Sequence, residues 1–201
     1  MPGIIRLNSF LSRCGICSRR QADKYISEGR VKVNNIVVTV LGTKIETDND
    51  IIEFDGKKIN IPRENSYFIL NKPAGVVTTL YDPQERKTIR SYTEEIGIRL
   101  FPMGRLDYDS EGLIILTDDG ELSHRIQHPR YGIEKVYVLE TDNVLNQKEL
   151  SKIRKGIMLD DGLMKVLSIR INSKSARGAS YRITIAEGRK RVLRRLFDKI
   201  G

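Results

Sequence analysis

The spacing of apolar residues predicts short helices and strands in two successive groups. In the first group, apolar positions recur every three or four residues over 6–14 and over about 18–28, which is the spacing of amphipathic helices. Ser18 and Gln21 fit a capping box at the start of the second helix. Strands bounded by turn residues are then predicted at 31–33, 36–40 and 51–54.

The second group begins after 61–66, a short polar stretch that contains a proline. Strands are predicted at 67–70, 76–79, 113–116, 134–139, 165–171 and 180–185. Helices are predicted at 121–127 and 147–155, and a basic helix follows a glycine turn within 187–197. Loops are expected at 81–86, 156–162 and 172–178, the last of them mobile, and 88–96 is too weakly patterned for a prediction. Two domains, 1–61 and 67–201, are therefore expected, joined by a linker at 62–66.

The net charge narrows the class of partner. The 201 residues carry 35 Lys and Arg against 26 Asp and Glu, a net charge of +9. A surplus of this size favours a polyanion as partner, although an ordinary basic globular protein remains an alternative. No apolar run reaches the roughly 20 residues of a membrane span, and the N-terminus lacks the apolar region of a signal peptide. We therefore expect a cytoplasmic protein without a membrane partner.

The cysteines and histidines do not predict a metal site. Cys14 and Cys17 form a single C-x-x-C, and the sequence has no second Cys or Cys/His pair to complete a four-ligand zinc site. His124 and His128 lie four residues apart without a carboxylate at metalloprotease spacing. We interpret the cysteines as small apolar residues at a helix junction and expect neither a metal nor a cofactor.

Cations dominate the first 33 residues. Arg6, Arg13, Arg19, Arg20, Lys24, Arg30 and Lys32 stand against only Asp23 and Glu28. Arg19 and Arg20 fall in the first turn of the second predicted helix, where the helix dipole disfavours positive charge. A bound phosphate backbone explains their presence, and a solvated helix face is the alternative.

The stretch from Met103 to Gly120 combines loop carboxylates with an apolar run. Arg105 and Asp107 fall on a glycine-flanked loop, 113–116 reads as a buried strand, and 118–120 reads as a turn. A rigid strand directly behind a loop carboxylate is one way in which a fold aims an acid at a substrate. The spacing alone also fits a hairpin with solvated acids.

Residues 104–120 resemble the catalytic motif of the pseudouridine synthases, in the family that modifies ribosomal RNA and carries an N-terminal S4-like domain. Residues 4–60 resemble the S4 RNA-binding domain, and Asn71-Lys72-Pro73-Ala74-Gly75 is similar to the segment that opens the family's catalytic domain. The resemblance implies an α+β fold, with a small S4-like domain followed by a mixed, mostly antiparallel catalytic domain. It also implies that uridine in ribosomal RNA is converted to pseudouridine without a cofactor. The reaction breaks the N1–C1′ bond, turns the uracil and rejoins it through C5.

The resemblance implies roles for two residues of the loop. Asp107 matches the carboxylate that assists glycosidic cleavage, either by attacking C1′ or by removing a sugar proton. Composition alone does not separate it from Asp109 and Glu111. Arg105 is expected to fill the gap left by the extruded base, with a phosphate contact or an internal ion pair as the alternative.

Two further site residues are implied in the second half of the chain. Tyr137 resembles the aromatic residue that stacks on the target uracil, although its pattern also fits a core aromatic. Arg194 resembles the arginine that pairs with the catalytic aspartate and keeps it ionised, with Arg189 as the reserve candidate. The segment departs from the family pattern at Val192, where the family has Gln. The residues expected to contact RNA are Arg105, Arg19, Arg20, Lys24, Arg30, Lys72, Lys135 and Arg189.

The remaining expectations concern the target and the extent of the chain. The segment 156–162, with its Leu-Asp-Asp-Gly, looks more like the large-subunit RNA enzymes, and a monomer is expected. Family members usually continue beyond the basic helix, so the chain ending at Gly201 is either shortened or a short member. A non-catalytic RNA-binding or ribosome-assembly factor remains the alternative function. A glycosylase, which releases free base, is a third.

Overall fold

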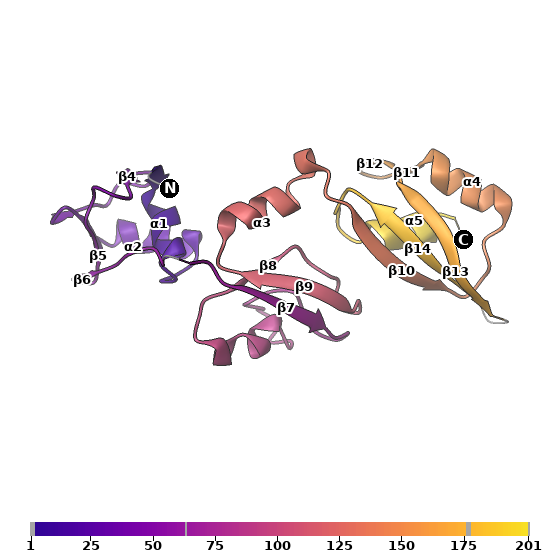
Figure 1. The fold of residues 1–201 in the computed structure, drawn as a ribbon, viewed down its shortest axis with the longest axis horizontal. Helices are drawn as coiled ribbons and strands as arrows, with labels where there is room; N and C mark the ends of the chain where they lie inside the picture. Colours follow the sequence, from indigo (N-terminus) through magenta and orange to yellow (C-terminus); the bar gives the residue numbers. More distant parts are fainter. Residues whose placement is uncertain (1–2, 63, 176–177, 201) are drawn as a thin grey trace. The chain divides into compact units, whose positions relative to one another are not determined.

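The computed structural model describes residues 3–62, 64–175 and 178–200. It divides into two compact units, Met1–Ser123 and His124–Gly201, which are described separately (Figure 1). Helices are combined with small antiparallel sheets, which confirms the α+β class. Within the described ranges, every helix is too short or too polar to cross a bilayer. The domain limits at 61 and 67 stay predictions.

The first part of unit 1 folds as two helices beside two small sheets. Helices α1 (Leu7–Arg13) and α2 (Arg19–Ser27) agree with the predicted helices. Ser18 caps α2, because its Oγ accepts a hydrogen bond from the Gln21 amide at 3.2 Å. One sheet pairs β1 (Ile4–Arg6) with β4 (Lys44–Glu46), and the other has the order β3 (Ile36–Val37), β2 (Val31–Val33), β5 (Ile52–Phe54), β6 (Lys57–Lys58). Buried residues of both helices and both sheets, Leu11, Ile26 and Ile45 among them, form one core.

Three details of this part differ from the prediction. Strand β3 ends at Val37 instead of 40, since its register with β2 covers only two pairs. Beyond the end of β3, the side chains of Val40 and Leu41 are exposed, so their burial does not favour a longer strand. Strands β1 and β4 were not predicted, because β1 runs directly into α1 and β4 contains a single apolar residue, Ile45.

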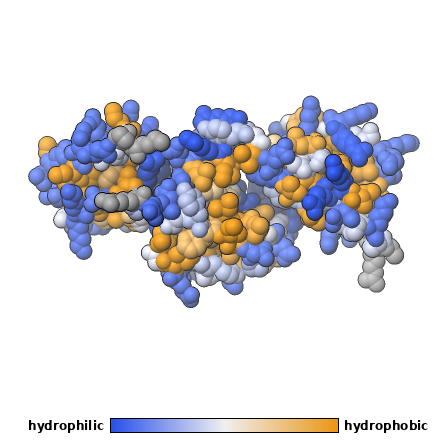
Figure 2. All heavy atoms as spheres, in the orientation of Figure 1, coloured by the Kyte–Doolittle hydropathy of each residue, from blue (hydrophilic) through white to orange (hydrophobic). Residues whose placement is uncertain are grey.

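The second part of unit 1 is a three-stranded antiparallel sheet. Its order is β7 (Tyr67–Lys72), β9 (Gly112–Thr117), β8 (Phe101–Met103), and the 3₁₀ turns η1 (Ile89–Tyr92) and η2 (Glu94–Ile96) lie in the connection before β8. Strand β9 buries Ile114 and Leu116 in a core with Val76, while Leu113 is 73% exposed. On the face seen in Figure 2, hydrophobic residues gather where Figure 1 places β7 and β9.

The strand predicted at 76–79 is wrong. Only Val77 makes a bridge, to Thr88, and its amide bonds to the Lys87 carbonyl at 2.9 Å. The side chains on either side, Val76 and Thr78, are both buried, Val76 in the core and Thr78 against the loop that follows β8. Residues 76–79 therefore form a packed loop with one isolated bridge instead of a strand.

Unit 2 begins within α3 (Gly120–Gln127), which η3 (Pro129–Tyr131) follows. Its sheet is antiparallel, in the order β10 (Lys135–Thr141), β14 (Gly178–Ile185), β13 (Ser168–Ser175). Helix α4 (Gln147–Lys155), the hairpin of β11 (Ile157–Leu159) and β12 (Gly162–Met164), and helix α5 (Val192–Asp198) all contribute to one core with this sheet. Tyr181, at its centre, accepts a hydrogen bond on its hydroxyl from the Leu145 amide at 2.7 Å, which fixes the approach to α4.

Two loop predictions in unit 2 are wrong. Residues 156–162 are not a loop, because β11 pairs with β12 and only Asp160 and Asp161 form the turn. Residues 172–175 belong to β13, since polar side chains are accommodated on a strand whose pairing with β14 continues beyond the core. The tip of this predicted loop, 176–177, lies outside the described residues.

Candidate active site

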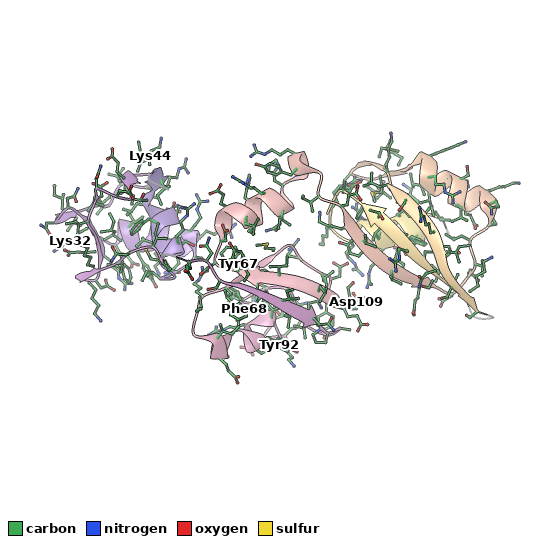
Figure 3. All side chains as sticks on the ribbon, in the orientation of Figure 1. Lys32, Lys44, Tyr67, Phe68, Tyr92 and Asp109 are labelled. Atoms are coloured by element: carbon green, nitrogen blue, oxygen red, sulfur yellow. The ribbon has the colours of Figure 1, made fainter. Side chains whose placement is uncertain are left out.

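The loop between β8 and β9 carries Arg105 and Asp107. Arg105 is exposed, whereas Asp107 is half-buried. Asp109 and Glu111 are both exposed, so burial separates the three carboxylates that composition did not. Figure 3 shows Asp109 near the end of β7 and Tyr67 near its beginning. The Asp107 carbonyl accepts a hydrogen bond from the Ser110 amide at 3.1 Å, which closes a turn after the carboxylate.

The backbone on both sides of Asp107 is fixed by the segment after β7. Thr78 Oγ1 donates a hydrogen bond to the Leu106 carbonyl at 2.7 Å and accepts one from the Leu106 amide at 3.3 Å. The Gly75 amide donates to the Tyr108 carbonyl at 2.7 Å. The acid therefore stands between two anchored residues.

Lys72, at the end of β7, contacts the backbone of the same loop. Its side chain is fully buried, and its Nζ donates to the carbonyls of Pro73 and Val76, both at 2.9 Å, and lies 3.5 Å from the Tyr108 carbonyl. Burial lowers the pKa of Lys72, while the negative charges of Asp109 and Asp107 act in the opposite direction. This placement does not support the RNA contact expected of Lys72, because the ammonium has no exposed surface.

Tyr137 and Lys135 lie on β10 with their side chains on the same face. Tyr137 pairs with Ile183 of β14, is half-buried and packs against the core of unit 2. Lys135 is also half-buried, and its Nζ lies 3.4 Å from the Ile133 carbonyl. A ring that is held by a core on one side and partly open on the other suits stacking on a base.

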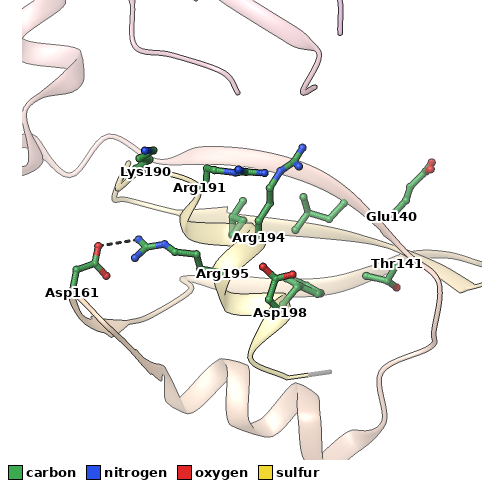
Figure 4. A pocket seen from close by; sticks show the side chains of 11 residues that line it. Glu140, Thr141, Asp161, Lys190, Arg191, Arg194, Arg195 and Asp198 are labelled. Carbon is green, nitrogen blue, oxygen red and sulfur yellow. Dashed lines mark hydrogen bonds and ion pairs between the residues drawn. The ribbon is translucent and has the colours of Figure 1, made fainter. Parts of the chain in front are cut away.

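Arg194 lines a cavity of about 810 Å³ beside α5 (Figure 4). The lining combines apolar side chains from β10 and α5, including Leu139 and Phe197, with the cations Lys190 and Arg191. The helix begins only at Val192, because Arg191 adopts a left-handed conformation with φ of 49°. The basic helix predicted within 187–197 is therefore shorter at its start than expected.

Arg189 is held inside unit 2 by the β11–β12 turn. Its Nη1 donates to Asp161 Oδ1 at 2.8 Å and to the Asp161 carbonyl at 3.0 Å, and its Nη2 donates to the Leu163 carbonyl at 3.2 Å. Its Nε donates to Glu187. These bonds engage every guanidinium nitrogen, so the geometry supports neither the reserve pairing with Asp107 nor an RNA contact by Arg189.

The predicted RNA-contact cations of the first 33 residues divide into two groups. Arg19, Arg20 and Lys24 are exposed on α2. Arg30, in contrast, donates two hydrogen bonds to Asp55, and its guanidinium lies 4.1 Å from the Tyr25 ring centre and 4.8 Å from that of Phe54. The side chain of Arg30 is therefore held by partners within the first part of unit 1. This placement does not support the RNA contact expected of Arg30.

Sequence reasoning missed two supporting residues. Thr78 was read as part of a strand, and Asp161 as part of a loop. In the sequence, a Thr directly after two valines and an Asp directly before a glycine are weak signals, since both residue types are common at such positions. In the described ranges no group of three or more His, Cys, Asp or Glu side chains is placed to hold a metal ion.

The family model described as RNA pseudouridylate synthase matches residues 66–199, and the S4 domain model matches residues 5–52. The chain therefore belongs to the RNA pseudouridine synthase family, whose members isomerise uridine in RNA.

Among curated relatives, the chain is 46% identical over 198 residues to an "Uncharacterized RNA pseudouridine synthase" of Aquifex aeolicus, covering 98% of this chain and 79% of that one. It is 40% identical over 198 residues to the "Ribosomal large subunit pseudouridine synthase B" of Bacillus subtilis, and the match covers 98% of this chain and 80% of that one. A solved structure titled "Crystal structure of pseudouridylate synthase" superposes with a TM-score of 0.62 at 30% identity, over 98% of this chain and 84% of that one. None of these matches supports the non-catalytic alternative.

Proposed function

We propose that this enzyme isomerises a uridine of ribosomal RNA, with the large-subunit RNA as the favoured target. The similarity to the Bacillus subtilis large-subunit enzyme, over 98% of the chain, supports the choice of RNA. The observation that carries the catalytic assignment is the half-buried Asp107 between two anchored residues, Leu106 and Tyr108. A cytoplasmic location and a monomer stay predictions.

Asp107 is the carboxylate that acts at the sugar. It attacks C1′, or stabilises the positive charge that develops there and removes a sugar proton, while the N1–C1′ bond breaks. The uracil then turns, C5 bonds to C1′, and the hydrogen at C5 is lost to solvent as N1 takes up a proton. The atoms of substrate and product are the same, so the reaction needs neither an oxidant nor a reductant.

Three other residues act on the same nucleotide in this proposal. Tyr137 offers a partly open ring for stacking on the uracil during its rotation. Arg194 is the cation that pairs with the carboxylate of Asp107 in this proposal. Arg105, exposed in the Asp107 loop, fills the space that the extruded nucleotide leaves.

RNA outside the active site is bound by exposed cations. Arg19, Arg20 and Lys24 form one exposed group on α2, which suits phosphate contacts to structured RNA. Lys135, half-buried at the first position of β10, is a further candidate. Arg30, Lys72 and Arg189 are not included, because each is held by internal partners.

The target is tested by mapping pseudouridine in both ribosomal RNAs from cells with and without the gene. Loss of one or a few large-subunit sites, restored by the wild-type gene and not by a gene encoding Asp107→Asn, is expected. Loss confined to small-subunit RNA would overturn the choice of subunit. An unchanged map in both RNAs would overturn ribosomal RNA as the substrate.

A further inference from the structure

Within the described part of the chain, the side chain of Thr78 hydrogen-bonds to both backbone groups of Leu106, the residue before the proposed catalytic acid. Its Oγ1 donates to the Leu106 carbonyl at 2.7 Å and accepts from the Leu106 amide at 3.3 Å. A hydroxyl is the smallest side-chain group that can donate and accept at once. The two bonds together define the direction of the Leu106 peptide groups, and so the direction in which the chain enters Asp107.

Thr78 is itself held firmly. It is 6% exposed, and the preceding Val76 is buried in the core with Ile89 and Leu100. Between them, the Val77 amide bonds to the Lys87 carbonyl at 2.9 Å, and the Val77 carbonyl accepts from the Ile89 amide at 3.1 Å. The hydroxyl is therefore presented by a segment that is anchored through both side chains and backbone.

The residue after Asp107 is fixed by a different group. The Tyr108 carbonyl accepts from the Gly75 amide at 2.7 Å. If the Thr78 hydroxyl is removed, this second anchor remains, so the loop should stay closed while Asp107 gains freedom on its N-terminal side. Loss of the hydroxyl also leaves the amide and carbonyl of the half-buried Leu106 without this partner, which favours a local shift of the loop.

We propose that Thr78 is a positioning residue for uridine isomerisation, which sets the placement of Asp107 through its paired hydrogen bonds to Leu106. The inference rests on the proposed catalytic role of Asp107. It adds a specific requirement to that role, namely that the acid depends on one hydroxyl that does not touch the nucleotide.

Threonine 79 provides a matched control in the neighbouring position. Its Oγ1 also donates to a backbone carbonyl, that of Tyr81 at 2.8 Å, and accepts from the Tyr81 amide at 3.3 Å. Tyr81 is 75% exposed and lies just before the turn at 83–84. Thr79→Val therefore removes the same chemical arrangement without reaching the Asp107 loop.

The test compares Thr78→Val, Thr78→Ser and Thr79→Val in the full chain. The substrate is a mixture of unmodified transcripts of both ribosomal RNAs labelled with tritium at C5 of uridine, and kcat and KM are obtained from tritium release. Val keeps the shape of Thr without the hydroxyl, and Ser keeps the hydroxyl. Thr78→Ala removes the same hydroxyl and leaves more space, so it carries the test if Thr78→Val does not fold.

We expect Thr78→Val to lower kcat by about 10- to 100-fold with KM within about twofold of wild type, since small displacements of a catalytic group have effects of this size. Thr78→Ser should recover kcat to within about threefold, and Thr79→Val should match the wild type. Equal loss in Thr78→Val and Thr78→Ser, or full activity in Thr78→Val, would overturn the proposal. Asp107→Asn, assayed beside them, separates the two claims, because full turnover in that variant overturns the role of Asp107 whatever Thr78 does.

Discussion

Asp161 holds Arg195, the residue directly after Arg194: its Oδ2 accepts a hydrogen bond from Arg195 Nη2 at 2.9 Å. The other carboxylate oxygen accepts from Arg189, so one acid in the β11–β12 turn binds cations on both sides of the start of α5. Successive helical residues point about 100° apart. In Figure 4, Arg195 reaches Asp161 while Arg194 points to another side of the helix. Together with the buried Val192 and Leu196, the hairpin thereby restrains the rotation of α5, and with it the direction of Arg194.

Asp161→Asn should therefore lower turnover through Arg194. The amide nitrogen of Asn cannot accept a hydrogen bond, so either Arg195 loses its bond to residue 161 or Arg189 loses one of its several bonds. We expect turnover to fall about fivefold in the wild-type background and to change less than twofold in an Arg194→Ala background, as for residues that act through one another. Single-turnover rates of the four proteins give this cycle.

The neighbouring Asp160 is the control for Asp161. Its side chain is 95% exposed, and its ion pair with Lys199 is 3.9 Å long. Asp160→Asn should leave turnover unchanged. An equal loss for Asp161→Asn with and without Arg194 would show that the hairpin acts on the enzyme by another route.

The same network predicts a pH dependence of stability. The hydrogen bond from Arg195, together with the charges of Arg189 and Arg195, lowers the pKa of Asp161 below its ordinary value of 3.8. A carboxyl whose pKa is lower in the folded state stabilises the fold above its unfolded pKa, and this contribution is lost as the pH falls through the folded pKa. The free-energy difference between wild type and Asp161→Asn should be constant from pH 7 to about pH 5 and shrink below about pH 4.

Urea unfolding at a series of pH values measures this difference. Because the pair is partly exposed, this difference in free energy of unfolding should be small. A difference that already disappears between pH 7 and 5 would show that another group carries the effect.

The exposed cations of α2 should control RNA affinity and its salt dependence. Replacing both Arg19 and Arg20 by Ala removes two exposed charges. We expect weaker binding and a decrease of about 1.4–1.8 in the slope of log affinity against log salt, since each phosphate contact contributes about 0.7–0.9. Filter binding of ribosomal RNA transcripts between 50 and 200 mM salt, a range wide enough to resolve such slopes, checks this, and an unchanged slope would place the RNA elsewhere.

Arg30→Ala serves as the contrast to that pair. Its guanidinium bonds to Asp55 and lies against the rings of Tyr25 and Phe54. Its removal should lower the melting temperature of the protein, because stacking and an ion pair are lost, with little change in the salt slope. Thermal unfolding and the same binding series distinguish the two outcomes.

Periodicity predicted the elements that are long enough to show it. Helix α2, with Ser18 as its cap, and strands β9 and β14 lie close to the predicted limits. Strand β1 runs directly into α1, β4 has a single apolar residue, and β8 contains Pro102, which is unusual in a strand, so no local pattern marks them. The hairpin at 157–164 was missed because its polar Asp-Asp-Gly turn resembles a loop.

The part of the candidate site that lies within one local sequence motif, residues 104–120, could be predicted from the sequence. Arg105 and Asp107 lie on the expected loop, but Lys72, Arg30 and Arg189 show the limit of reading charge from sequence. Each of these cations was expected to meet RNA, and each is bound by carbonyls or carboxylates from other segments. A cation's partner depends on tertiary contacts, which composition and spacing do not contain.

The most direct test of the account is the rate of pseudouridine formation by purified Asp107→Asn, with Asp109→Asn as the matched control two residues away. Both variants should fold and bind ribosomal RNA transcripts as the wild type does. We predict that Asp107→Asn loses turnover by a factor on the order of a thousand or more, as expected for an essential catalytic group, while Asp109→Asn stays within a few-fold of wild type. Full turnover by Asp107→Asn would contradict the assignment of this acid.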